Sequence, residues 1–124
     1  MNKQEIFDRA VCGVYSQGKK SISGEKFGQV CAYRGNNGLK CAIGHIITDE
    51  QIEKYKVDNS SSIDSFSEEL IEVICSDDDA EEFLIQLQDA HDAASTSLDF
   101  KTDFLSRANF VATRFNLNPW TPKT

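Results

Sequence analysis

The amino-acid sequence predicts a mostly helical α+β domain with about five helices and one small β-hairpin. Two observations lead to this fold class. Apolar residues recur at helical spacing in several segments, and a polar stretch with Asn-Gly at its centre separates two short arms. A chain of 124 residues is long enough to bury one core. We therefore expect residues 1–118 to form a single globular domain and residues 119–124 to form a short tail.

The helices are expected where helical spacing coincides with a start signal. The first covers residues 2–17, because Asn2 and Glu5 have the spacing of a capping box. Thr48 and Gln51 repeat that pattern and open a second helix that ends near residue 55. Further helices are expected over residues 64–75, 79–94 and 99–116, followed or separated by polar turns such as residues 95–99.

The β-hairpin is expected after a polar loop at residues 19–28. Its arms are residues 29–34 and 39–42, and residues 35–38 form the turn because Asn-Gly tolerates a positive φ. Residues 41–47 should then form a short helical or turn segment, in which Gly44 lets the backbone approach a neighbour closely.

Charge is distributed unevenly along the chain. Residues 1–48 contain seven Lys and Arg against three Asp and Glu, whereas residues 49–124 contain six against seventeen. No Lys or Arg lies between Lys56 and Lys101, a window with thirteen acidic residues. This field would repel phosphates, so the expected partner is a basic protein surface and not nucleic acid. A solvated face that keeps the protein soluble is the plainer alternative. The acidic residues expected to bind are Asp77, Asp78, Asp79, Glu81 and Glu82.

The cellular compartment is expected to be the cytoplasm. The first residues lack the apolar core of a signal peptide, and no apolar run approaches the roughly 20 residues of a membrane span. We therefore expect reduced cysteines and no membrane partner. Cys12 and Cys75 lie in apolar helical patterns and should behave as small core residues.

Cys31 and Cys41 lie on opposite arms of the expected hairpin, and three interpretations stay open. In the first they are small apolar side chains beside a turn. In the second Cys31, Cys41, His45 and His91 bind zinc, although the usual closely spaced pair of ligands is missing. In the third Cys41 is a nucleophile and His91 its base. Lys40 and the start of a helical segment would then lower the pKa of the Cys41 thiol.

His91 is expected to face the core, where a hydrogen-bonded structural histidine is commoner than a catalyst. Asp92 follows it in the helix and points about 100° away, so we expect it not to orient the imidazole. Arg34 and Lys40 are expected to bind the acidic helices of their own chain. No metal and no cofactor are expected.

Two motifs connect these residues. They are Tyr-Arg-Gly-x-x-Gly-x-Lys-Cys-Ala-x-Gly at residues 33–44 and Leu-Gln-x-x-His-Asp at residues 87–92. Together they resemble motifs of small proteins from phages, prophages and bacteria, a group without an established activity. The chain departs from that group at Thr48, where Pro is expected, and at His45, where a smaller residue or Cys is expected. The second departure weakens a metal or catalytic role for His45. The matching site positions are Cys31, Tyr33, Arg34, Lys40, Cys41, His91 and Asp92.

The function that follows from charge and resemblance is a small acidic accessory protein that binds another protein without catalysis. Its partner would be a basic host protein, such as a nucleic-acid-binding or defence protein, which it would block. A cysteine-dependent hydrolase or transferase using Cys41 and His91 is one alternative. A small zinc-stabilised domain is the other.

Overall fold

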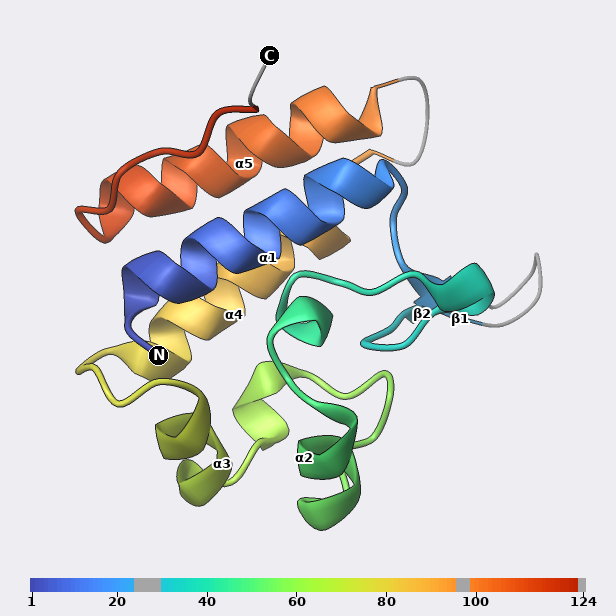
Figure 1. Ribbon diagram of the computed structural model, residues 1–124, viewed down its shortest axis with the longest axis vertical. Helices are drawn as coiled ribbons and strands as arrows, with labels where there is room; N and C mark the ends of the chain where they lie inside the picture. The colour runs from blue at the N-terminus through green and yellow to red at the C-terminus, as the bar shows by residue number, and fades with distance from the viewer. Residues whose placement is uncertain (24–29, 96–98, 123–124) are drawn as a thin grey trace.

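The computed structural model describes residues 1–23, 30–95 and 99–122. Its long helices are α1 (Lys3–Gln17), α4 (Ala80–Asp92) and α5 (Phe100–Arg114). These three pack against one another, with α1 in contact with both α4 and α5 (Figure 1). The shorter helices α2 (Asp49–Lys54) and α3 (Glu68–Ile74) lie at the other end of the molecule. Single 3-10 turns form at Asn36–Gly38, Ile43–His45 and Ile63–Ser65.

The expected fold class of α+β is wrong, because the domain is all-α. Within the described ranges the only strand pairing is an antiparallel ladder of two residues on each side, β1 (Ile22–Ser23) with β2 (Val30–Cys31). It does not join the two expected arms. Residues 24–29, which include part of the expected loop and the first residue of one arm, lie outside the described residues. The same holds for residues 96–98 of the expected turn and 123–124 of the tail.

The expected hairpin is replaced by contacts with a distant residue. The backbone of Tyr33 donates to the carbonyl of Asn59, and the backbone N–H of Arg34 donates to the Asn59 side chain. These bonds occupy the arm that was expected to pair with residues 39–42. The turn instead closes on itself, since the Gly35 N–H donates to the carbonyl of Leu39 at 2.8 Å.

The helices agree well with their sequence signals. Both capping boxes form, with Asn2 and Glu5 at the start of α1 and with Thr48 and Gln51 at the start of α2. The third expected helix begins later than residue 64, because Ser67 is the N-cap residue of α3 and accepts from the Leu70 N–H. No helix of the described chain is both long enough and apolar enough to cross a membrane.

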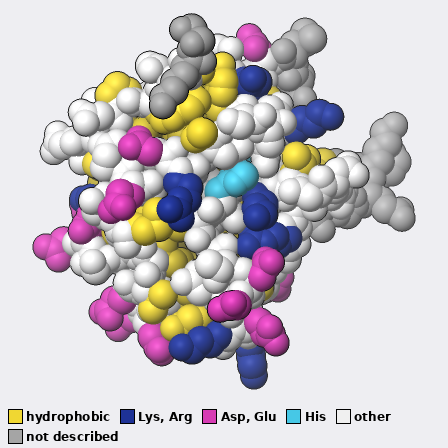
Figure 2. Space-filling view, in the orientation of Figure 1, with side chains coloured by type: hydrophobic (Ala, Val, Ile, Leu, Met, Phe, Trp, Pro, Cys, Tyr) yellow, Lys and Arg dark blue, Asp and Glu magenta, His cyan; other side chains and the backbone are white. Residues whose placement is uncertain are grey.

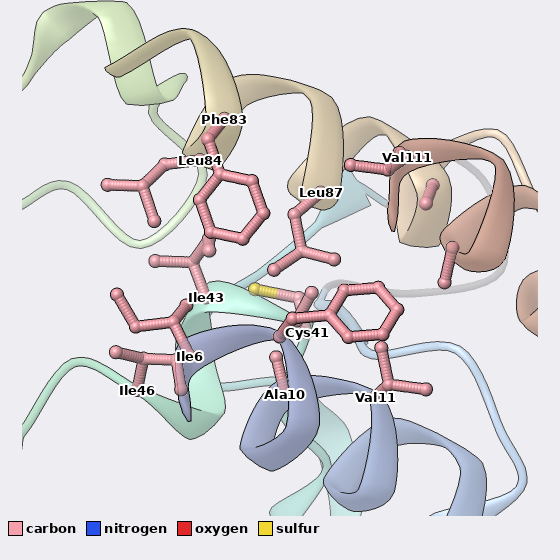
Figure 3. Packing of buried hydrophobic residues seen from close by; sticks show 14 of the residues in the cluster. Ile6, Ala10, Val11, Cys41, Ile43, Ile46, Phe83, Leu84, Leu87 and Val111 are labelled. Carbon is pink, nitrogen blue, oxygen red and sulfur yellow. The ribbon is translucent and has the colours of Figure 1, made fainter. Parts of the chain in front are cut away.

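The core is formed by the inner faces of the three long helices together with residues 41–47 (Figure 3). Cys41 and Ile43 point between α1 and α4, so the segment after the expected hairpin is part of the core. Gly44 lies against the carbonyl oxygen of Tyr33, where a Cβ atom would overlap it, and the expected close backbone approach is confirmed. Cys75 is buried as expected. The expectation for Cys12 is wrong, because its position on α1 faces solvent.

Candidate functional site

Acidic side chains surround a hollow between α3 and α4, which we name the acidic hollow. Its volume is about 570 Å³, and its lining also includes the apolar residues Phe66, Ile71 and Ile85. The carboxylates of the first helical turns also face the positive ends of the two helix dipoles, which favours their charge. The acidic residues that line the hollow are Glu68, Glu72, Asp77, Asp78, Asp79, Glu81 and Glu82.

One cation of the chain reaches this cluster. The Lys3 ammonium lies 2.7 Å from the Asp79 carboxylate, and the Lys3 backbone N–H donates to Asp77. The hydrogen bond that the Lys3 ammonium donates to Asp79 raises the pKa of Lys3. Among the described residues no other Lys or Arg forms an ion pair with the acidic hollow. Figure 2 shows acidic side chains along the left margin of this face, and others beside basic side chains at its lower end. The hollow thus keeps surplus negative charge.

Arg34 binds an acidic helix of its own chain, as expected, but this helix is α2 and not α3 or α4. Its Nε donates to the Asp49 carboxylate at 2.8 Å, at the start of α2. Its two terminal nitrogens donate to the carbonyls of Gly44 and Ile47, at 2.7 and 2.8 Å. The guanidinium therefore joins the segment before α2 to the start of that helix, and Arg34 does not line the acidic hollow.

Lys40 and Tyr33 also lie outside the acidic hollow. The backbone of Lys40 exchanges hydrogen bonds with the side-chain amide of Gln17. No ion pair of the Lys40 side chain is found within the described parts of the chain. Tyr33 is buried, and its hydroxyl donates to the Ser61 carbonyl at 2.7 Å. Burial raises the pKa of Tyr33. The contacts of the Lys40 backbone and of the Tyr33 hydroxyl thus stabilise the fold and are not part of the acidic hollow.

Cys41 is fully buried, and the expectation of an activated thiol is wrong. Its sulfur accepts a hydrogen bond from the Gly44 N–H at 3.3 Å. Burial raises the pKa of the Cys41 thiol to about 12 and outweighs the hydrogen bond from Gly44, which lowers it. The geometry therefore gives no support to Cys41 as a nucleophile with His91 as its base.

Asp92 does contact the imidazole of His91, contrary to the expectation from helix geometry. The Nδ1 atom of His91 lies 2.8 Å from Oδ1 of Asp92. The two Cα–Cβ bonds diverge, but both side chains are long enough to bend toward each other at the end of α4. Gln88, one turn earlier, donates to the same carboxylate oxygen at 2.9 Å. The other ring nitrogen, Nε2, accepts from the backbone N–H of Ser21.

Cys31 joins this group, and the resemblance had already placed it in one site with His91 and Asp92. Ligand atoms of Cys31, His91 and Asp92 lie within 4.8 Å of one another. Cys31, Gln88 and Asp92 also line a pocket of about 380 Å³ between α4 and the segment after α2. Burial and the Asp92 carboxylate raise the pKa of the Cys31 thiol to about 11. The pairing of Ile22 with Cys31 brings Cys31 close to His91 and Asp92. No local sequence signal predicts this pairing.

This group resembles a metal-binding set, but the hydrogen bonds argue against His91 as a ligand. A backbone N–H can only donate, so Nε2 of His91 must be unprotonated and Nδ1 must carry the proton. Binding a metal through Nδ1 would move that proton to Nε2, directly against the Ser21 N–H. The arrangement therefore suits a structural histidine, with Asp92 accepting from its ring.

His45 lies apart from this group of ligand atoms. Its Nε2 is 3.1 Å from the Gln17 side-chain oxygen, and its ring packs against Gly13 of α1. Burial lowers the pKa of His45 to about 4, with smaller effects from Lys40, His91 and Arg34. Of the four candidate metal ligands, the group found in the structure contains Cys31 and His91, with Asp92 added and Cys41 and His45 left out.

Comparison of this chain with models of protein families, with curated proteins and with solved structures finds no match.

Proposed function

We propose that the protein is a non-catalytic binding module whose acidic hollow takes a basic, amphipathic segment of another protein. The observation that carries the proposal is the composition of the acidic hollow. Carboxylates of α3, α4 and the connection between them line it together with the apolar residues Phe66, Ile71 and Ile85. Within the described ranges only Lys3 balances them by an ion pair.

The two kinds of surface select one kind of partner. Lys and Arg side chains would meet the carboxylates at the rim, while an apolar side chain of the same segment would cover Phe66 and Ile85. Complementary charge accelerates association and rejects acidic surfaces, and it makes binding weaker at high salt. The apolar residues of the lining add an attraction that salt does not screen.

We also propose the setting of this activity. The resemblance to small phage and prophage proteins supports an accessory protein that covers a basic surface of a host protein in the bacterial cytoplasm. The cysteines are all free thiols, in agreement with a reducing compartment. A thiol enzyme and a zinc-stabilised domain receive no such support, because Cys41 is buried and His91 is held in its protonated-Nδ1 form.

The test is capture of a partner by immobilised protein from a bacterial lysate at low and at high salt. The informative variant is Glu72→Gln with Glu81→Gln, which removes two charges from the acidic hollow. The matched control is Glu50→Gln with Glu53→Gln, which removes two exposed charges from α2. The captured protein is then purified and titrated against all three forms.

We expect the wild-type protein and the α2 variant to bind the same basic protein at low salt, and the variant of the acidic hollow to bind it at least tenfold more weakly. Circular dichroism checks that all forms are folded. Equal binding by the three forms, or binding that does not respond to salt, would contradict the proposal. So would the absence of any salt-sensitive partner.

A further inference from the structure

A second groove runs between α4 and α5, and we name it the α4–α5 groove. Its volume is about 640 Å³. The α4 wall contributes the carboxylates of Glu82 and Asp89, and the α5 wall contributes the guanidinium groups of Arg107 and Arg114. Phe110 also lines it and is 64% exposed, the most exposed large apolar side chain of the described core-forming helices.

Acidic residues of the α4 wall and basic residues of the α5 wall lie at matching ends of the groove. Helices α4 and α5 are joined at one end by a short connection and run antiparallel (Figure 1). Glu82 therefore lies at the same end as Arg114, and Asp89 lies toward the end that holds Arg107. Within the described residues no ion pair joins the two walls. Arg107 contacts Asp103 of its own helix at 3.1 Å, an exposed pair of small energy.

We propose that a second copy of this chain occupies the α4–α5 groove and forms a symmetric dimer. The two-fold axis would run along the groove. Rotation about such an axis exchanges the two walls and keeps the ends in place. The α4 wall of each copy then lies over the α5 wall of its partner.

This symmetry matches every charge in the groove. Glu82 would meet the second copy's arginine at position 114, and Asp89 would meet the arginine at position 107, twice over in the dimer. The two copies of Phe110 would cover each other's apolar floor, formed by Ala90, Ala93 and Val111. The pKa of Asp89 is raised by burial and by Asp92 and Glu82, so an incoming arginine also meets an uncompensated acid. A partner with only basic or only acidic residues would be repelled by one of the two walls, because that wall carries the same charge.

The first test is the mass in solution, measured by sedimentation velocity across a concentration series. We expect a dimer for the wild-type protein and a monomer for Phe110→Ser. Val73→Ser is the matched control, because Val73 is a second exposed apolar residue, on α3 and away from the groove. It should leave the dimer intact, and both variants should keep the helical circular dichroism of the wild type.

The second test reverses the walls. One variant carries Arg107→Glu and Arg114→Glu, so both of its walls are acidic. The other carries Glu82→Arg and Asp89→Arg, so both of its walls are basic. Each variant alone should be monomeric, whereas an equal mixture should form a heterodimer, since every wall then meets its opposite.

A wild-type protein that stays monomeric at high concentration would overturn the proposal. It would also be overturned if the dimer survived both Phe110→Ser and the charge reversals, or if the mixed variants stayed monomeric. Phe110, Arg107 and Arg114 line the α4–α5 groove and not the acidic hollow, whereas Glu82 lines both. Failure here is therefore distinguished from failure of the acidic hollow by the Phe110→Ser and the Arg107→Glu, Arg114→Glu variants, which should leave binding at the acidic hollow unchanged.

Discussion

The backbone N–H of Ser21 donates to Nε2 of His91 over 2.9 Å, although the two residues are 70 positions apart in the sequence. This contact determines the protonation of the ring. Because Nε2 must offer its lone pair, the proton is on Nδ1, where Asp92 accepts it. A buried, neutral ring with both nitrogens satisfied is a stable structural element.

The other histidine has the opposite form. The side-chain nitrogen of Gln17 donates to the carbonyl of Lys40 at 2.6 Å, so its oxygen faces His45. The Nε2 atom of His45 must then carry the proton. We predict that long-range ¹⁵N–¹H correlation spectra at neutral pH show an Nδ1–H ring for His91 and an Nε2–H ring for His45. Two identical patterns would contradict the hydrogen bonds described above.

Replacing His91 should be costly. His91→Ala leaves a cavity in the core and an unpaired buried N–H at Ser21, so we expect a loss of about 3 kcal/mol in the free energy of unfolding. Urea denaturation measures this loss. The comparison variant is Asp92→Asn, whose amide oxygen can still accept from Nδ1, and it should cost much less. Equal losses for the two variants would show that the ring is not held by Ser21.

The effect of Gly13→Ala should change sign with the residue at position 45. In the wild type an added Cβ atom would lie 2.6 Å from the His45 ring, so the substitution should destabilise the protein. In a His45→Ala background the space is free, and Ala in a helix should stabilise by up to about 1 kcal/mol relative to Gly. Thermal unfolding of the four proteins of this cycle measures the coupling. Additive effects would mean that the ring does not pack on Gly13.

Stability should fall in mild acid because of His45. An unfolded histidine has a pKa near 6.5, whereas burial lowers the pKa of His45 in the folded protein to about 4. Below pH 6.5 the unfolded state therefore binds more protons, and the stabilisation present at neutral pH is lost progressively toward pH 4. The slope is at most about 1.4 kcal/mol per pH unit and is reduced because the ring is only half-buried.

The check is the free energy of unfolding between pH 7 and pH 5, above the range in which most carboxylates titrate. His45→Gln should remove most of the slope in this window. A variant that keeps the wild-type slope would show that another group is responsible.

The thiols should differ widely in reactivity. Cys12 is exposed and should react first with iodoacetamide at pH 8. Cys31 should react slowly, because burial and Asp92 raise its pKa to about 11, and Cys41 should be protected until the protein unfolds. Mass spectrometry of timed samples identifies each site. Asp92→Asn should accelerate Cys31 alone, whereas early labelling of Cys41 would contradict its burial.

The helices could be predicted from the sequence because their signals are local. Asn2 with Glu5, and Thr48 with Gln51, act within one turn, and both capping boxes form. The hairpin could not be predicted reliably, since Asn59 competes for the backbone of residues 33 and 34 from 25 positions away. The exact start and end of each helix also depend on contacts with distant residues, whereas the existence of the helix depends mainly on local signals.

The candidate site was predictable only in part. The acidic run is visible in the sequence, and Asp77 to Glu82 do line one hollow. The contacts of Arg34 could not be fully predicted, because its guanidinium also donates hydrogen bonds to the carbonyls of Gly44 and Ile47. Composition does not reveal such contacts. The burial of Cys41 likewise depends on how α1 and α4 close over it.

The amide of Ser21 makes an unusual reporter group. Its hydrogen is sheltered while the segment after α1 stays docked on the last turn of α4. Deuterium uptake at this one position should therefore report the opening of this contact, and a single resolved resonance would monitor it in every variant that keeps His91.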